Sequence, residues 1–452
     1  MGDSFTKSFR VNEYITLKLE FGKTFIYLKD KKFLQCIRLA LNLKKDDHQI
    51  YDAIDSIDEA AEVYKLTLWR NKIVEGPKAI PSVIENETIA PEEEFWGHCS
   101  NIQTWVELNY NTRILHSNLS FYLLLALAKL GDKKASNVFR EEVAQRFESG
   151  YLPTQISLIN QQHLFYLNKE QLESIINLKK INYLLEKFPN DMVLKSELGL
   201  ICGKLKLDNK ALRLIKEVED FNPKDYSIWE SVGRYYYGIL HDNEKAIRAW
   251  KRGLDLKPDS YFLLNRLGYI YRILKKFKKA KISLEKSLEL NSTFSWTLTN
   301  LAILYMEQGE NKKAKIYYEK AIENDPFQES AYSNLGELYY LEKKYKKAEL
   351  LFRKELKNHP DHYGALYYMG CLYNRRKEYF HAIKVLEYAL GYDDSQKQFF
   401  SINDLSIYKQ LCVAYYRVRN YKKAQKMVLE VIKLNSDDKC INYLENKLSN
   451  TK

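Results

Sequence analysis

The chain has 452 residues and a formal net charge of +12, with 45% hydrophobic residues, 17 glycines and 9 prolines. This composition is that of a globular protein, and it excludes a chain made largely of linker or low-complexity sequence. The charge is uneven: residues 1–150 carry 20 basic and 22 acidic side chains, so the positive surplus belongs to the remainder.

Three features of the sequence indicate where in the cell the protein is located. Residues 1–10 lack the apolar core of a signal peptide, and the longest apolar run, 119–128, is too short to span a bilayer. The six cysteines show no CxxC spacing: Cys36, Cys99, Cys202, Cys371, Cys412 and Cys440. We therefore expect a cytoplasmic protein with no disulfide framework and no membrane contact.

Residues 1–151 contain no repeat and predict a small α+β domain. Residues 8–28 alternate in polarity like strands, with a hairpin turn at 21–23. Four helices are predicted from capping residues, an acidic first turn and a glycine that ends a helix. They lie at about 57–72, from Pro91 onward, at about 118–130 and at about 133–148.

His98, Cys99 and His116 are the residues here that invite a metal or nucleophile hypothesis. An adjacent His-Cys pair is not a metal-ligand spacing, and no second CxxC or HxxxH motif supports one. The sequence also lacks GxGxxG, P-loop and GxSxG motifs. We predict no catalytic site, no metal and no cofactor, and keep an enzyme in the N-terminal domain as an alternative.

Residues 95–151 and the segment DSIDEAAEVY resemble an uncharacterised module found in archaeal proteins ahead of repeat arrays. The resemblance implies an adaptor joined to an exchangeable binding array, and it implies no activity. Residues 152–189 predict two helices, which we interpret as a degenerate repeat that connects this module to an array.

From residue 190 the chain repeats with a period of 34. The prolines follow one another in steps of 34, 35, 68 and 34: Pro189, Pro223, Pro258, Pro326 and Pro360. A small residue recurs ten positions later: Gly199, Gly233, Gly268, Ala302, Gly336 and Gly370. An alanine follows about twelve positions further on: Ala211, Ala246, Ala280, Ala314, Ala348 and Ala382. This period predicts stacked helix pairs.

The spacing has a physical reason. The small residue on the first helix and the alanine on the second lie where the helices cross closely. A tyrosine three residues after the small one, and a large apolar residue four after the alanine, are expected to pack between neighbouring units. A seventh unit, displaced by an insertion at about 395–402, gives seven repeats over 190–437, with a capping helix in 438–452.

These positions resemble the tetratricopeptide repeat family. The resemblance implies a mostly α fold, a right-handed helical solenoid of about seven repeats behind the N-terminal domain. It also implies a protein-protein interaction scaffold that binds a peptide or partner protein in a concave groove lined by the first helix of each pair.

By register, twelve residues are predicted to contact the partner in that groove: Arg234, Asn265, Arg266, Tyr269, Arg272, Trp296, Asn300, Asn334, Tyr340, Tyr367, Tyr368 and Arg375. Arginine, tyrosine and asparagine suit bidentate contacts, contact area and peptide-backbone hydrogen bonds. Asn300 and Asn334 share a register and resemble the start of an asparagine ladder. The basic array favours an acidic partner, and self-association stays open.

Lysine pairs recur before the alanines: Lys278–Lys279, Lys312–Lys313, Lys346–Lys347 and Lys422–Lys423. A nucleic-acid surface is one interpretation of this stripe. We favour a solvated helix face, because no aromatic pattern of the kind that single-strand binders use accompanies the lysines.

Overall fold

A computed structural model describes residues 7–33, 91–112, 114–115, 117–391 and 404–434. The chain divides into two compact units, residues 1–190 and 191–452. The predicted helix at 57–72, His116, the insertion and the C-terminal capping helix lie outside the described residues.

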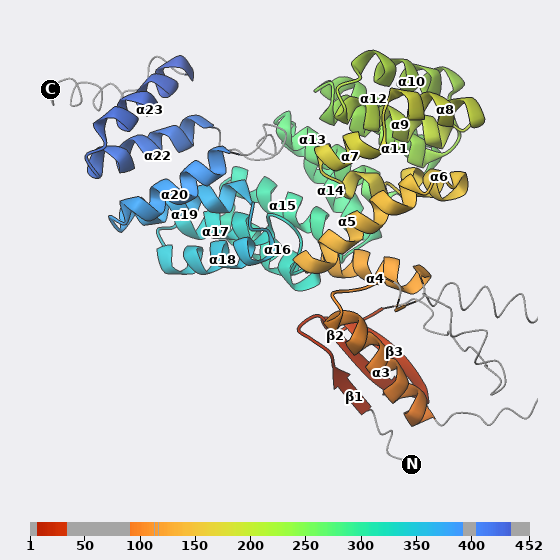
Figure 1. Ribbon diagram of the computed structural model, residues 1–452. Helices are drawn as coiled ribbons and strands as arrows, with labels where there is room; N and C mark the ends of the chain where they lie inside the picture. Colours follow the sequence, from red (N-terminus) through yellow and green to blue (C-terminus); the bar gives the residue numbers. More distant parts are fainter. Residues whose placement is uncertain (1–6, 34–90, 113, 116, 392–403, 435–452) are drawn as a thin grey trace, which may run out of the picture. The chain divides into compact units, whose positions relative to one another are not determined.

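The first unit begins with an antiparallel sheet in the order β1-β2-β3-β4: Lys7–Arg10, Ile15–Glu20, Lys23–Leu28 and Lys31–Lys32. The predicted hairpin is confirmed, since Phe21 and Gly22 both have positive φ in a two-residue turn between β2 and β3. Helix α3 (Pro91–Glu107) packs on β2 and β3, and the alternating residues Ile15, Leu17 and Ile26 are buried (Figure 1).

Helices α4 (Ser117–Lys129) and α5 (Lys133–Glu148) follow at the predicted places. Asp132 caps α5 by accepting hydrogen bonds from the backbone N–H groups of Lys134 and Ala135, both at 3.0 Å. The Tyr110 hydroxyl also donates to Asp132.

The prediction of two helices within 152–189 is wrong. The structure has three short α-helices and a 3-10 turn: α6 (Leu152–Asn160), η2 (His163–Tyr166), α7 (Lys169–Ile175) and α8 (Leu178–Lys187). The breaks occur where Asn168 and Asn177 accept hydrogen bonds from the backbone and start new helices.

The described residues of the second unit form seven helix pairs, which confirms the predicted repeat count. We name the first helix of each pair helix A and the second helix B. The A helices are α9 (Met192–Lys204), α11 (Tyr226–Gly238), α13 (Tyr261–Ile273), α15 (Ser295–Glu307), α17 (Ala331–Leu341), α19 (Tyr363–Arg375) and α22 (Asp404–Arg417).

The B helices are α10 (Asp208–Phe221), α12 (Asn243–Leu256), α14 (Phe277–Leu290), α16 (Asn311–Asn324), α18 (Tyr345–Asn358), α20 (Tyr379–Leu390) and α23 (Tyr421–Leu434). From α12 on, each B helix packs on the A helix of the next pair, so the units share one continuous apolar core (Figure 1).

The close crossing of helices A and B is confirmed. A Cβ added to Gly233 would lie 2.2 Å from Trp250 Nε1, and one added to Gly268 would lie 2.4 Å from Leu284 Cγ. The side chain that covers the glycine is the large residue four positions after the alanine. That residue closes the crossing of its own pair, where a small residue leaves room for its bulk. Phe352 also stacks on Tyr368 of the next repeat, as expected for a residue between neighbouring units.

Candidate functional site

All twelve predicted contact residues lie on helix A of their pairs, on α11, α13, α15, α17 and α19. We name the exposed and half-buried side chains on these five helices the helix-A surface. Their burial differs widely, from Asn265 and Asn300, which are 6% exposed, to Trp296, which is 47% exposed. A shared helix face therefore does not give these residues a shared role.

The arginines of α11 and α13 lie beside carboxylates. Arg266 Nη2 is 3.5 Å from Glu230 Oε1, and Arg234 Nη1 is 3.8 Å from Glu230 Oε2. Arg272 Nη1 donates to Glu307 Oε1 of α15 at 2.5 Å. Burial lowers the pKa of Arg266 while Glu230 raises it, and an arginine stays charged at neutral pH. The pairs Arg266–Glu230 and Arg272–Glu307 tie successive repeats together, whereas Arg234–Glu230 lies within α11.

Several polar atoms among these charged groups have no hydrogen-bond partner within the described part of the chain. They are Arg266 Nε, Arg272 Nε and Glu230 Oε1. Buried polar groups are ordinarily satisfied by protein, water or ligand. All three atoms are buried, and Glu230 Oε1 lies beside Arg266 Nη2, so they belong to an interior charged cluster that joins α11 and α13.

The tyrosines form two groups on the helix-A surface. Tyr237 and Tyr269 share a hydrogen bond of 3.0 Å between their hydroxyls, and Arg272 lies over the Tyr269 ring. In repeats 5 and 6, Tyr340 packs against Tyr345 and Tyr368, with ring centroids 5.4 and 5.1 Å apart.

Burial raises the pKa of Tyr340 to about 12. Tyr368 is only 8% exposed and stacks on Phe352. Arg375 is exposed and lies 4.0 Å from the centroid of the Tyr345 ring. Most of these rings therefore contact one another rather than solvent.

Asn265 and Asn300 form an internal link between repeats 3 and 4. Asn300 Nδ2 donates to Asn265 Oδ1 at 2.9 Å, and Thr297 Oγ1 donates to the same oxygen at 3.3 Å. Asn334 has the register of Asn300 but is only half-buried. The two asparagines of the predicted ladder are therefore unequal, because the amide of Asn300 already serves a neighbouring repeat.

Two aromatic side chains stand out by exposure. Trp296 is 47% exposed and Phe262, at the same register one repeat earlier, is 37% exposed. The predicted contact residues include Trp296 but not Phe262. It also missed Glu307, the partner of Arg272, because a carboxylate from the next repeat shows no pattern in the sequence.

The second lysine of three predicted pairs lies against the tyrosine three residues after the small position. Lys313 lies 5.2 Å from the Tyr305 ring centroid, Lys347 lies 5.7 Å from that of Tyr339, and Lys423 lies 5.0 Å from that of Tyr415. Lys313 and Lys423 also pair with Glu310 and Glu387. Three of the eight lysines of the stripe are thus occupied by contacts within the protein.

The described residues contain no group of three or more side chains arranged to hold a metal ion. Cys99 is 2% exposed, and burial raises the pKa of its thiol to about 11, which disfavours the reactive thiolate. His98 lies on the same helix with Nε2 at 3.4 Å from Glu94 Oε1.

A serine and a histidine meet between repeats 5 and 6. Ser330 Oγ is 2.9 Å from His362 Nε2, but His362 Nδ1 accepts a hydrogen bond from the backbone N–H of Ala365. The proton therefore belongs on Nε2, which donates to the serine. This tautomer cannot accept the serine proton, so the pair caps helix α19 and lacks the geometry of an activated nucleophile.

None of the helices in the described part of the chain combines the length and apolar character that a membrane span requires.

No curated protein matches the chain. The resemblance of the N-terminal residues to an archaeal module stays a prediction.

Several solved structures are similar in part. PilF of Pseudomonas aeruginosa is 18% identical, with 50% of this chain and 98% of that one covered and a TM-score of 0.42. The APC/C hetero-tetramer Cut9–Hcn1 is 14% identical, with 78% and 63% covered and a TM-score of 0.49. MamA is 24% identical, with 34% and 88% covered and a TM-score of 0.30. Likeness at this level carries no functional inference.

Two family models match the array directly. Both are described as tetratricopeptide repeat, and they cover residues 263–294 and 299–363. These stretches run from α13 to the start of α19 and include the crossing positions Gly268, Ala302 and Gly336. The predicted family resemblance is confirmed for these residues, which are tetratricopeptide repeats.

Proposed function

We propose that this chain is a non-enzymatic scaffold that binds a peptide or an extended segment of a partner protein on its helix-A surface. The observation that carries the proposal is a pair of exposed aromatic side chains at one register of adjacent A helices, Phe262 on α13 and Trp296 on α15. Arg266 lies over the Phe262 ring, 4.9 Å from its centroid. Arginine and tryptophan are enriched among residues that dominate binding energy.

The two arginines of α13 would favour an acidic residue of the partner near repeats 2 and 3. Asn334, Tyr340, Tyr367 and Arg375 would extend the contact toward repeats 5 and 6. Affinity in the micromolar range, about −8 kcal/mol, is typical of such a peptide.

A cytoplasmic location belongs to the same proposal. The described cysteines Cys99, Cys202, Cys371 and Cys412 are free and buried, as expected for a protein of a reducing compartment. No specific observation favours the two alternatives, nucleic-acid binding through the lysine pairs and an enzyme in the N-terminal unit.

Trp296→Ala is the variant that tests the helix-A surface, with Trp96→Ala as its matched control. Trp96 is 51% exposed and lies in the N-terminal unit, so the two changes remove the same side chain at similar exposure. The full chain and both variants are immobilised and exposed to lysate of the source cell. We expect one partner to be retained by the wild type and Trp96→Ala.

With that partner purified, Trp296→Ala should weaken its binding by about thirtyfold, the effect of removing a central aromatic anchor. Equal retention by all three proteins would contradict the assignment of binding to the helix-A surface.

A further inference from the structure

In the three middle repeats, most of the positive charge lies on the B helices. Helices α14 and α16 each carry four lysines against two glutamates, and α18 carries five basic against two acidic residues. The A helices of repeats 4 and 5, α15 and α17, each carry one glutamate and no basic residue. The surplus of these three B helices is separate from the helix-A surface, and it needs its own explanation.

The outermost position of helix B is the second residue after the alanine. The alanine and the residues four and seven positions after it face the core, and 100° per residue places the second residue opposite them. In the seven repeats this position holds Arg213, Arg248, Ile282, Ile316, Leu350, Lys384 and Lys426. It is aliphatic in the three middle repeats and basic in the other four.

The three aliphatic side chains are well exposed: Ile282 by 66%, Ile316 by 52% and Leu350 by 58%. Single exposed apolar residues are ordinary on protein surfaces. Three at the same outward register in successive repeats form a row, and a row of this kind indicates an interaction surface.

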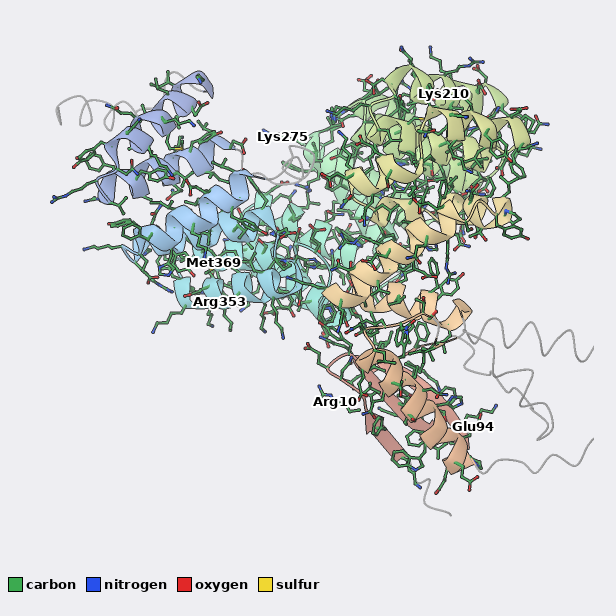
Figure 2. All side chains as sticks on the ribbon, in the orientation of Figure 1. Arg10, Glu94, Lys210, Lys275, Arg353 and Met369 are labelled. Atoms are coloured by element: carbon green, nitrogen blue, oxygen red, sulfur yellow. The ribbon has the colours of Figure 1, made fainter. Side chains whose placement is uncertain are left out.

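Lysines flank each aliphatic residue one helical turn before and one turn after it. The two lysine rows are Lys278, Lys312 and Lys346, and Lys286, Lys320 and Lys354. All six are exposed, and no carboxylate in the described part of the chain lies within 4.0 Å of any of their amino groups. Arg353, which Figure 2 labels on α18, is not counted with them, because its guanidinium pairs with Glu349 at 2.8 Å.

We infer that these nine residues, the B-face patch, dock the protein onto the surface of an anionic lipid bilayer. The aliphatic side chains at the outermost positions of three helices can enter the headgroup region, while the lysines on both sides of them contact anionic headgroups. We expected no membrane contact because no segment can span a bilayer, but docking on its surface requires no span.

The composition of the B-face patch disfavours a nucleic acid. Bases stack on aromatic rings or guanidinium planes, and isoleucine and leucine at the centre of the patch offer neither. A second copy of this chain would have to cover the lysine rows with carboxylates, whereas α14, α16 and α18 all carry a basic surplus. Charge complementarity thus favours an anionic lipid surface.

The test is sedimentation of the full chain with vesicles of phosphatidylcholine, with and without phosphatidylserine, at low and high salt. We expect binding only to the anionic vesicles and its loss at high salt. Ile282→Gln, Ile316→Gln and Leu350→Gln combined should weaken binding by about tenfold or more. Lys278→Gln, Lys312→Gln and Lys346→Gln combined should weaken it by about a hundredfold, at roughly fivefold per lysine.

Leu429→Gln is the matched control, because Leu429 is 56% exposed on α23 and outside the patch. It should bind anionic vesicles like the wild type. Binding that is absent at low salt, equal on both vesicle types, or unchanged in the aliphatic variant would overturn the proposal. So would a change in the oligomeric state of the aliphatic variant without vesicles, which would assign the patch to a second copy. The helix-A surface is intact in every variant, so the proposed function does not depend on this result.

Discussion

The crossing of helices A and B and the helix-A surface are two regions of the same helices with opposite properties. At the crossing, Gly233 and Trp250 leave no room for a methyl group. On the surface, Phe262 and Trp296 are exposed by 37% and 47%. The residues that stabilise the fold and those proposed to bind a partner therefore lie at different positions of helix A. Single substitutions should change the free energy of unfolding and the binding of the partner independently.

Gly233→Ala should have the largest effect on stability. The added Cβ would lie 2.2 Å from Trp250 Nε1, which is buried and donates to the backbone oxygen of Glu230 at 3.2 Å. We expect a loss of about 3 kcal/mol in the free energy of unfolding, measured by urea denaturation. Gly238→Ala is the control, since its Cβ would meet nothing within 4 Å. Equal losses in both variants would refute the steric explanation.

Acidification should destabilise the junction of repeats 5 and 6 through His362. This residue is 2% exposed, and burial lowers its pKa from 6.5 to about 3. The unfolded chain therefore binds more protons between these values, so the stability present above pH 6.5 is lost as pH falls. The contribution of His362 should fall by about 2 kcal/mol between pH 7 and pH 5.

His362→Asn keeps a capping side chain and removes this titration. Glu355, whose pKa is raised by burial, is protonated more readily in the folded state and opposes the effect. Since Glu355 is common to both proteins, the difference between their stability–pH curves reports His362. Parallel curves would show that His362 does not control this acid sensitivity.

Asn300→Ala should reveal whether Asn300 belongs to the interior or to the binding surface. It loses the 2.9 Å hydrogen bond to Asn265, which should cost about 1.5 kcal/mol in thermal or urea unfolding. Asn334→Ala, at the same register but half-buried, should cost under about 0.5 kcal/mol. If the two losses match, the link between Asn265 and Asn300 does not contribute to stability.

Arg266→Ala should have a small effect on stability, about 0.5 kcal/mol. The Arg266 side chain is 36% exposed, its ion pair with Glu230 is screened, and Arg234 remains near that carboxylate. Combined with Arg272→Ala, it should nevertheless abolish retention of the partner on the immobilised full chain. Unchanged retention by the double variant would move recognition away from α11 and α13.

Much of the array could be predicted from the positions that every repeat shares. The small residue, the alanine and the 34-residue period report packing that each pair repeats, so seven pairs and their crossings followed from spacing. The hairpin at Phe21–Gly22 and the starts of α3 and α5 could also be predicted, because turn and capping residues act on backbone only a few positions away.

The candidate site was less predictable. Register placed all twelve residues on A helices, yet it could not distinguish the internal amide of Asn300 from the exposed ring of Trp296. Two helices were expected across 152–189, but capping by Asn168 and Asn177 divides that segment further. The lysine pairs were predicted as a solvated helix face and the basic array as favouring an acidic partner, whereas exposed aliphatic residues accompany the lysines on α14, α16 and α18.

Sequence alone determined the architecture of this protein, because every repeat packs in the same way and therefore has the same residue types at the same spacing. Tertiary structure decided which polar groups are available to a partner. Arg272 meets Glu307 across 35 positions and Asn300 meets Asn265 across the same separation. Such pairings depend on how successive repeats stack, and a side chain's exposure is a property of its neighbours rather than of its own register.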